Sequence, residues 1–207
     1  MGRISGMQAI KEAVDKYGSS GGNYFKLEKD NDYAEVRMNH GDDMDLDIFI
    51  VHKVLVNGKV HYIECPSVDG LECPLCASGF KATPRIFISL LDLRDNQMKI
   101  WDRGKTEIGT IMGLITEYGP LNERDYKIQR HGKPNDTKTT YQFYNRDKSP
   151  RQLEPRQELL GHDLYIYKRS PEELKQMLDE KIITSADTQA SGYKAQSSGN
   201  SGMNKMF

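Results

Sequence analysis

The sequence has no apolar run that approaches the roughly 20 residues needed to span a membrane. Its first residues, MGRISGMQAIKEAV, lack the apolar segment of a secretory signal. Cysteine is scarce, with three in 207 residues. Three thiols cannot all pair within one chain, which excludes a disulfide framework. We therefore expect a protein with no membrane partner in a reducing, cytoplasmic compartment.

Neither sign of charge dominates, because 29 basic and 30 acidic residues give a net charge of −1. The distribution is uneven, however. Residues 81–151 contain 14 basic and nine acidic residues, a net of +5, whereas residues 1–80 contain eight basic and 13 acidic residues, a net of −5. A basic segment in a neutral chain can form a local positive groove, which favours a polyanionic partner. A solvated surface of mixed charge is the alternative.

All three cysteines lie in one short window, HKVLVNGKVHYIECPSVDGLECPLC, at residues 52–76. Cys73 and Cys76 have the two-residue gap of a metal-binding knuckle, and Cys65 lies shortly before them. Three unrelated buried thiols and a redox pair at the knuckle are the alternatives. The clustering favours a metal site.

A fourth ligand for such a site is available from histidine. His52 and His61 lie in the same window, and His40 lies further away. Three thiolates and one imidazole close the tetrahedron around Zn²⁺ and leave no position for a reactive water, which is typical of a structural site. Spacing alone does not choose between His52 and His61.

Apolar periodicity predicts a mainly β chain with a few helices. An Asn-Gly turn at residues 57–58 predicts a hairpin, and Gly119-Pro120 predicts the end of a helix. Strands are expected at residues 42–56, 60–65, 84–93, 97–101, 125–130, 139–145 and 163–169, and helices near residues 7–17, at 108–118 and from residue 170.

A helix after the third main strand, followed by two more strands, is the order of the five-stranded oligonucleotide/oligosaccharide-binding (OB) barrel. We expect residues 23–183 to form an OB-fold core with a zinc-binding module inserted at about residues 52–80. Residues 1–22 are expected to form a helical arm and linker. Residues 184–207, rich in Ser, Gly, Gln and Asn, are expected to be a disordered tail.

The stretch from His52 through the Asn-Gly-Lys turn to Cys65 and the Cys-Pro-Leu-Cys knuckle resembles the zinc module of phage single-stranded DNA-binding proteins. The strongest likeness is to the helix-destabilising proteins of the T-even bacteriophages, over roughly residues 46–118. In that family the histidine stands thirteen residues before the first cysteine. The resemblance thus implies one structural Zn²⁺ bound by His52, Cys65, Cys73 and Cys76.

The resemblance also implies a function. It implies a non-enzymatic protein that coats single-stranded DNA during phage DNA replication, recombination and repair, in the cytoplasm of the bacterial host. Phage replication and recombination proteins would be its partners. The chain departs from the family in its last residues, SSGNSGMNKMF, which contain no acidic residue, and in lacking the family's basic N-terminal motif. Recruitment through an acidic tail and cooperative binding are therefore not carried over.

Single-stranded nucleic acid is bound by cations along a groove and by aromatic side chains on which bases stack. The basic middle of the chain interleaves both residue types. Trp101, between Lys99 and Arg103, is the favoured stacking platform, with a place in the core as the alternative. The expected contacts are Lys81, Arg85, Lys99, Trp101, Arg103, Lys105, Arg130, Lys133, Lys138, Tyr141 and Tyr144.

Two other functions stay open on the sequence alone. Asp43, Asp45 and Asp47 would share one face of a strand and could hold the metal of a nuclease. No Glu-Lys or histidine constellation accompanies them, so an enzyme is not the favoured interpretation. The third possibility is an adaptor, stabilised by zinc, that binds proteins instead of nucleic acid.

Overall fold

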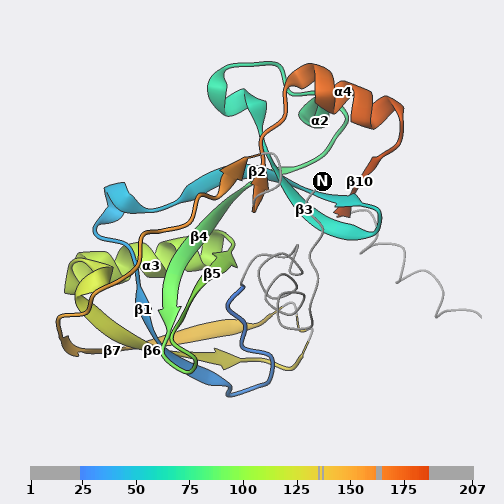
Figure 1. Ribbon diagram of the computed structural model, residues 1–207. Helices are drawn as coiled ribbons and strands as arrows, with labels where there is room; N and C mark the ends of the chain where they lie inside the picture. The colour runs from blue at the N-terminus through green and yellow to red at the C-terminus, as the bar shows by residue number, and fades with distance from the viewer. Residues whose placement is uncertain (1–23, 135, 137, 162–164, 187–207) are drawn as a thin grey trace, which may run out of the picture. The chain divides into compact units, whose positions relative to one another are not determined.

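The computed structural model describes residues 24–186, apart from residues 135, 137 and 162–164. The expected arm and linker at residues 1–22 lie outside the described residues. The described chain is mainly β and divides into two compact units (Figure 1). Of the described residues, unit 1 contains 24–49 and 84–158, and unit 2 contains 50–83 and 159–186.

Unit 1 is built on antiparallel strands that pair in the order β7-β6-β1-β4-β5. Among the described residues no backbone pairing joins β5 to β7, so the sheet is open. The elements are β1 (Tyr33–Met38), η1 (Asp43–Asp45), β4 (Ala82–Asp92), β5 (Gln97–Arg103), α3 (Lys105–Tyr118), η3 (Leu121–Glu123), β6 (Arg124–His131) and β7 (Thr140–Lys148).

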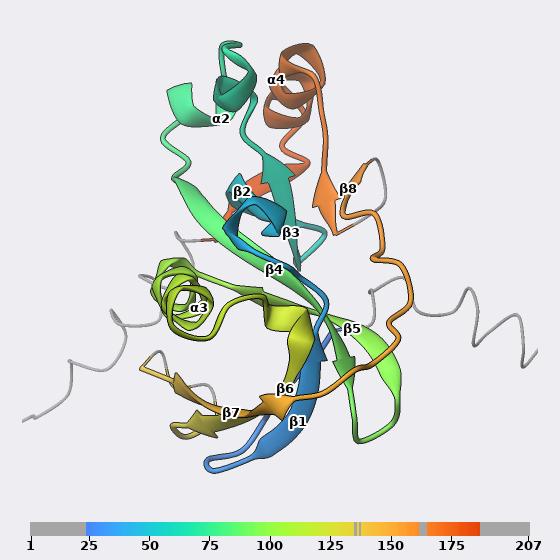
Figure 2. The ribbon, with the colours of Figure 1, turned by 90° about the vertical axis from the view of Figure 1, so that its left-hand side faces the viewer.

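The core of unit 1 lies between the inward faces of these strands and α3 (Figure 2). Alternation along β6 is strict, with every second side chain buried from Arg124 to Arg130. This period of two is what a sheet with one buried face requires. The largest fully buried aromatic residues of the cluster are Trp101 and Tyr126, and Ile111 of α3 packs with them.

Strand β1 is a central strand that the sequence patterns did not predict. It lies in the middle of the order and pairs with both β4 and β6. Its six residues, YAEVRM, bury Ala34, Val36 and Met38 on one face. The alternation was present in the sequence, but Ala and an adjacent Arg obscured it. That arginine, Arg37, is fully buried because Asp125 and the backbone of residues 122 and 149 bind its guanidinium.

Unit 2 contains the rest of the described chain. Its strands pair in the order β10-β2-β3-β9-β8, with β3, β9 and β8 parallel. Helices α2 and α4 lie side by side (Figures 1 and 2). The elements are β2 (Ile48–Val56), β3 (Lys59–Glu64), η2 (Pro66–Asp69), α2 (Pro74–Ala77), β8 (Leu160–Gly161), β9 (Ile166–Tyr167), α4 (Pro171–Asp179) and β10 (Ile183–Ser185).

Local sequence determines several boundaries of unit 2. The predicted hairpin turns at Asn57 and Gly58, whose φ angles of 51° and 76° are those an Asn-Gly turn supplies. Helix α4 begins with the expected capping box between Ser170 and Glu173. The predicted boundary of the tail at residue 184 falls inside β10, and residues 187–207 lie outside the described residues.

Candidate functional site

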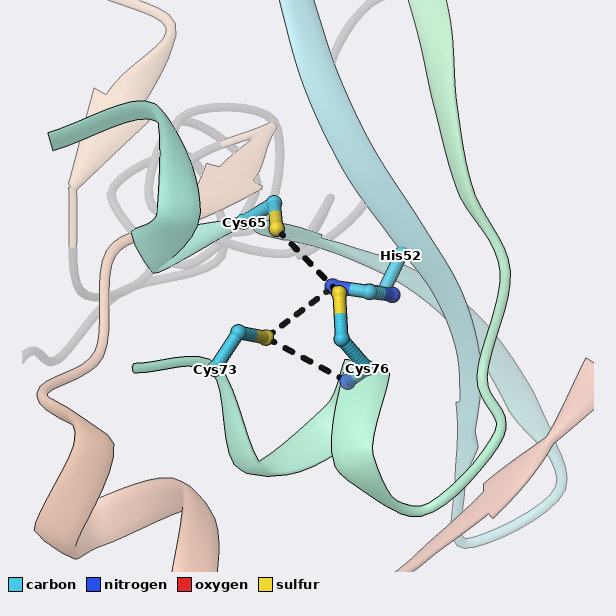
Figure 3. A group of neighbouring side chains, drawn as sticks. All are labelled: His52, Cys65, Cys73 and Cys76. Atoms are coloured by element: carbon cyan, nitrogen blue, oxygen red, sulfur yellow. Dashed lines mark hydrogen bonds between the residues drawn. The ribbon is translucent and has the colours of Figure 1, made fainter. Parts of the chain in front are cut away.

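The three cysteines and His52 converge in unit 2, as Figure 3 shows. His52 comes from β2, Cys65 follows β3, and Cys73 and Cys76 belong to the turn that opens α2. Their ligand atoms all lie within 4.8 Å of one another. The described part of the chain contains no other such group of His, Cys, Asp or Glu side chains. These four residues can hold one metal ion.

The cysteine knuckle forms because a helical turn starts at its first thiol. Cys73 is the N-cap of α2, and Pro74 occupies the first position, where a missing N–H costs nothing. The Cys76 backbone N–H donates to Cys73 Sγ over 3.4 Å, which brings both side chains to one side of the turn. If Cys73 holds a metal, this bond would help to orient its sulfur, as outer-shell hydrogen bonds do for metal ligands.

The His52 imidazole is oriented by a backbone carbonyl. Its Nδ1 lies 3.2 Å from the carbonyl oxygen of Lys81, so Nδ1 carries the proton and Nε2 presents its lone pair. That Nε2 lies 3.3 Å from Cys73 Sγ and 3.7 Å from Cys76 Sγ. Burial lowers the pKa of His52, which favours the neutral ring that a metal requires.

The other two histidines lie elsewhere. His61 lies on the same face of the β2–β3 hairpin as His52, opposite Val54, but it stacks on Tyr167, with ring centroids 4.9 Å apart, and is not part of the four-residue group. His40 is buried in unit 1, where Nε2 accepts from the Ser89 N–H. The structure therefore selects His52 from the three candidates, in agreement with the resemblance.

The thiols differ in their environments. Burial raises the pKa of the Cys73 thiol to about 11, so without a metal this group is protonated at neutral pH. Burial would also raise the pKa of Cys65, but hydrogen bonding with Ser67 outweighs it and lowers that pKa. Because a bound cation deprotonates its coordinating thiols, metal binding here must release protons.

Trp101, the favoured stacking platform, is not at the surface. Its exposed fraction is 0%, and it packs in the core of unit 1 with Phe25, Tyr141 and Phe143 around it. The reason is its register. Trp101 lies opposite Ile88, a core residue of β4, so the strand alternation turns the indole inward. The prediction that bases stack on Trp101 is wrong for this structure.

Arg103 and Tyr141 are brought together from β5 and β7. The Arg103 guanidinium lies 4.6 Å from the Trp101 ring centroid and 4.5 Å from that of Tyr141, and it donates to the Tyr141 hydroxyl over 2.7 Å. The arginine side chain is 20% exposed. Side-chain contacts thus join β5 to β7, where backbone pairing does not.

Three further predicted contacts are engaged within the protein. Arg85 pairs with Asp102 at 2.6 Å, and Lys99 pairs with Asp92 at 2.8 Å. Arg130 is buried, and its guanidinium binds carbonyls of the loop that follows β6. Arg130 therefore shapes that loop and is wrongly predicted as a phosphate ligand.

The remaining predicted cations are exposed lysines. Lys105 opens α3, Lys133 and Lys138 lie in the loop between β6 and β7, and Lys81 lies in unit 2. Within the described residues none of the four has an ion-pair partner. Tyr144 is also exposed, at 41%. The sequence interpretation missed Lys127, whose outward position on β6 follows from the same period of two.

The acidic run has a structural role instead of forming a metal site. Asp45 and Asp47 both bind Arg156, at 2.5 Å and 3.4 Å, and Asp42 caps η1. Opposite charge therefore compensates Asp45 and Asp47 within unit 1.

Comparison of the chain with models of protein families and with curated protein sequences finds no match. In the described residues, every helix is too short or too polar to cross a membrane.

Proposed function

We propose that this chain is a non-enzymatic single-stranded DNA-binding protein whose unit 1 is an OB-type barrel. The observation that carries the proposal is the pairing order of unit 1. Its strands along the chain are β1, β4, β5, β6 and β7, with α3 between the third and the fourth. The first strand pairs with the second and the fourth, as in the OB fold, and Arg103 and Tyr141 bridge the third and the fifth.

The charges around this bridge suit a flexible polyanion. Lys105 follows Arg103 by two residues, and Lys138 precedes Tyr141 by three. Lys133 lies in the same β6–β7 loop, which is one of the loops that OB folds use to bind oligonucleotides. Exposed lysines without carboxylate partners can contact phosphates at little cost, because no ion pair has to break.

We propose that the metal in unit 2 is one Zn²⁺ with a structural role. A tetrahedral site with Zn–S of about 2.3 Å and Zn–N of about 2.05 Å has sulfur–sulfur edges of about 3.8 Å and sulfur–nitrogen edges of about 3.6 Å. The corresponding distances here are 3.7 Å between Cys65 and Cys76, and 3.3 Å and 3.7 Å from His52 Nε2 to the two knuckle sulfurs. The donor set therefore fits zinc, with all four positions taken by protein.

The role in phage DNA replication, recombination and repair, in the cytoplasm of the bacterial host, rests on the resemblance of residues 46–118 to the T-even helix-destabilising proteins. A protein-binding adaptor remains the second candidate. It is favoured if the exposed lysines serve only solubility.

A titration of fluorescently labelled oligothymidine at several salt concentrations tests the proposal. We expect affinity to fall steeply with salt, by a slope of about 0.7 per phosphate contact. A Lys133→Gln/Lys138→Gln variant should bind more weakly and with a flatter slope. A Lys59→Gln/Lys175→Gln variant makes the same charge change in unit 2 and should bind as the wild type does. Absence of binding at low salt would overturn the proposal and favour the adaptor.

A further inference from the structure

A second group of aromatic and basic side chains lies on the outward face of β1, β6 and β7, on the opposite side of β7 from Tyr141. The Lys127 ammonium lies 4.5 Å from the ring centroid of Tyr33 and 5.3 Å from that of Tyr144. The register accounts for this arrangement. Lys127 is opposite Tyr144, and Tyr33 is opposite Gln129, the next outward position on β6.

The two rings are among the most exposed large side chains of unit 1. Tyr33 is 59% exposed and Tyr144 is 41% exposed. These tyrosines do not pack in the core. Ala34, Val36 and Phe143 fill the core from the opposite face of the same strands. The surface of the tyrosines is therefore available to a ligand.

In the described part of the chain, no carboxylate forms an ion pair with the Lys127 ammonium that lies between the rings. Glu35 is opposite Lys127 in the register, yet its carboxylate binds Arg146 at 2.5 Å instead. Within the described residues Lys127 has no ion pair, and its ammonium contacts π faces only. A cation held in this way can turn to an incoming anion without breaking a salt bridge.

We propose that Tyr33, Lys127 and Tyr144 form a subsite for single-stranded nucleic acid, in which unpaired bases stack on the tyrosines and Lys127 binds an adjacent phosphate. This inference rests on the proposed function and extends it to a second face of unit 1. The surroundings favour a nucleic acid over an apolar protein surface, because the rings are bordered by the polar side chains of Gln129, Gln142 and His131, which hydrogen-bond to Asn31 and to one another.

The position of β7 at the edge of the strand order suits a flexible ligand. β7 is the edge strand of the unit 1 order and carries Tyr141 inward and Tyr144 outward, three residues apart. Because Tyr141 packs against Trp101 and is hydrogen-bonded to Arg103, a flexible single strand that passes this edge can place unpaired bases on the outward rings only. A duplex cannot do so, since its bases are stacked inside and its backbone is stiff.

The test combines variants with a measurement on the unaltered chain. A Tyr33→Leu/Tyr144→Leu variant of the full chain should bind a labelled oligothymidine of about 16 nucleotides more weakly, by about 5- to 150-fold for each lost stack. Lys127→Gln should flatten the salt slope by about 0.7. Tyr118→Leu is the matched control. Tyr118 also contacts a cation, Arg124, but Tyr118 belongs to α3 and lies outside the proposed subsite. This variant should bind as the wild type does.

Photocrosslinking of wild-type protein to the same oligonucleotide, followed by peptide mapping, does not depend on any variant. We expect crosslinks on Tyr33 or Tyr144. Crosslinks confined to other residues, or unaltered affinity of the double variant, would overturn the subsite while leaving the proposed function intact. If the wild type fails to bind the oligonucleotide at low salt, the proposed function and the subsite both fail.

Discussion

Replacing His52 by Ala should remove most of the protein's affinity for zinc, whereas replacing His61 should not. Apparent binding free energies of structural zinc sites are about 10–16 kcal/mol. One of four ligands then accounts for roughly 3–4 kcal/mol, so we expect the affinity of the His52→Ala variant to fall by about 10²- to 10³-fold. His61 is the matched control, since it lies on the adjacent strand β3, opposite Val54 of β2, but stacks on Tyr167.

The assay is a competition for Zn²⁺ against a chromogenic chelator, with metal content of the purified proteins measured beside it. We expect about one zinc per wild-type chain. Zinc removal should also destabilise unit 2, because its core is small and two of the ligands, Cys65 and Cys73, belong to it. Equal zinc affinity of the two histidine variants, or wild-type protein with almost no zinc, would refute the reasoning.

Two predictions concern unit 1. Because Trp101 is fully buried, we expect aqueous iodide to leave its fluorescence nearly unquenched. We also expect Trp101→Ala to lower the free energy of unfolding by about 3–5 kcal/mol in urea titrations. Efficient quenching by iodide in the folded protein would contradict the burial of Trp101. Asp92 is buried, which would raise its pKa, but hydrogen bonds from Arg94 and Lys99 outweigh burial and lower the pKa to about 2. A lowered carboxyl pKa stabilises the fold above the unfolded value, near 4, and the contribution disappears as pH falls towards 2. The stability gap between wild type and Asp92→Asn, on the order of 2 kcal/mol at pH 7, should therefore narrow at pH 3; a gap independent of pH would count against it.

The local patterns predicted what local physics determines. Helix α3 ends at Gly119, the β2–β3 hairpin turns at Asn57-Gly58, and α4 opens at Ser170, as their sequences indicate. The knuckle is also local, because a two-residue gap places both thiols on one helical turn. These features depend on interactions among residues close together in the chain.

The choice of the fourth ligand was not local. His52 lies 21 residues before Cys73, and only the folding of β2 against β3 brings its ring to the thiols. The Lys81 carbonyl that orients the ring comes from further along still. Spacing therefore left His52 and His61 open, and the strand pairing decides between them.

The misplacement of Trp101 shows how burial sorts residues that the sequence presents as equivalent. Lys99, Trp101 and Arg103 alternate along β5 in the way that a cationic stacking surface would. Their partners across the ladder are Leu90, Ile88 and Ile86, all fully buried, so this face of β5 belongs to the core. On this face Lys99 forms an ion pair with Asp92, and Arg103 packs against Tyr141. The Trp101 indole between them is fully buried, so a ligand cannot reach it.

The opposite sorting holds at β6 and β7. Lys127 and Tyr144 are again a cation and an aromatic residue. The neighbouring pair on their face of the sheet, Gln129 and Gln142, is polar, so both Lys127 and Tyr144 remain accessible. Composition gives the number of cations and rings in a segment, whereas the parity of each strand relative to the apolar face determines which of them a ligand can reach. In a small β protein, candidate nucleic-acid contacts are therefore aromatic residues at the outward, polar positions of a strand. In unit 1 this criterion favours Tyr144 over Trp101.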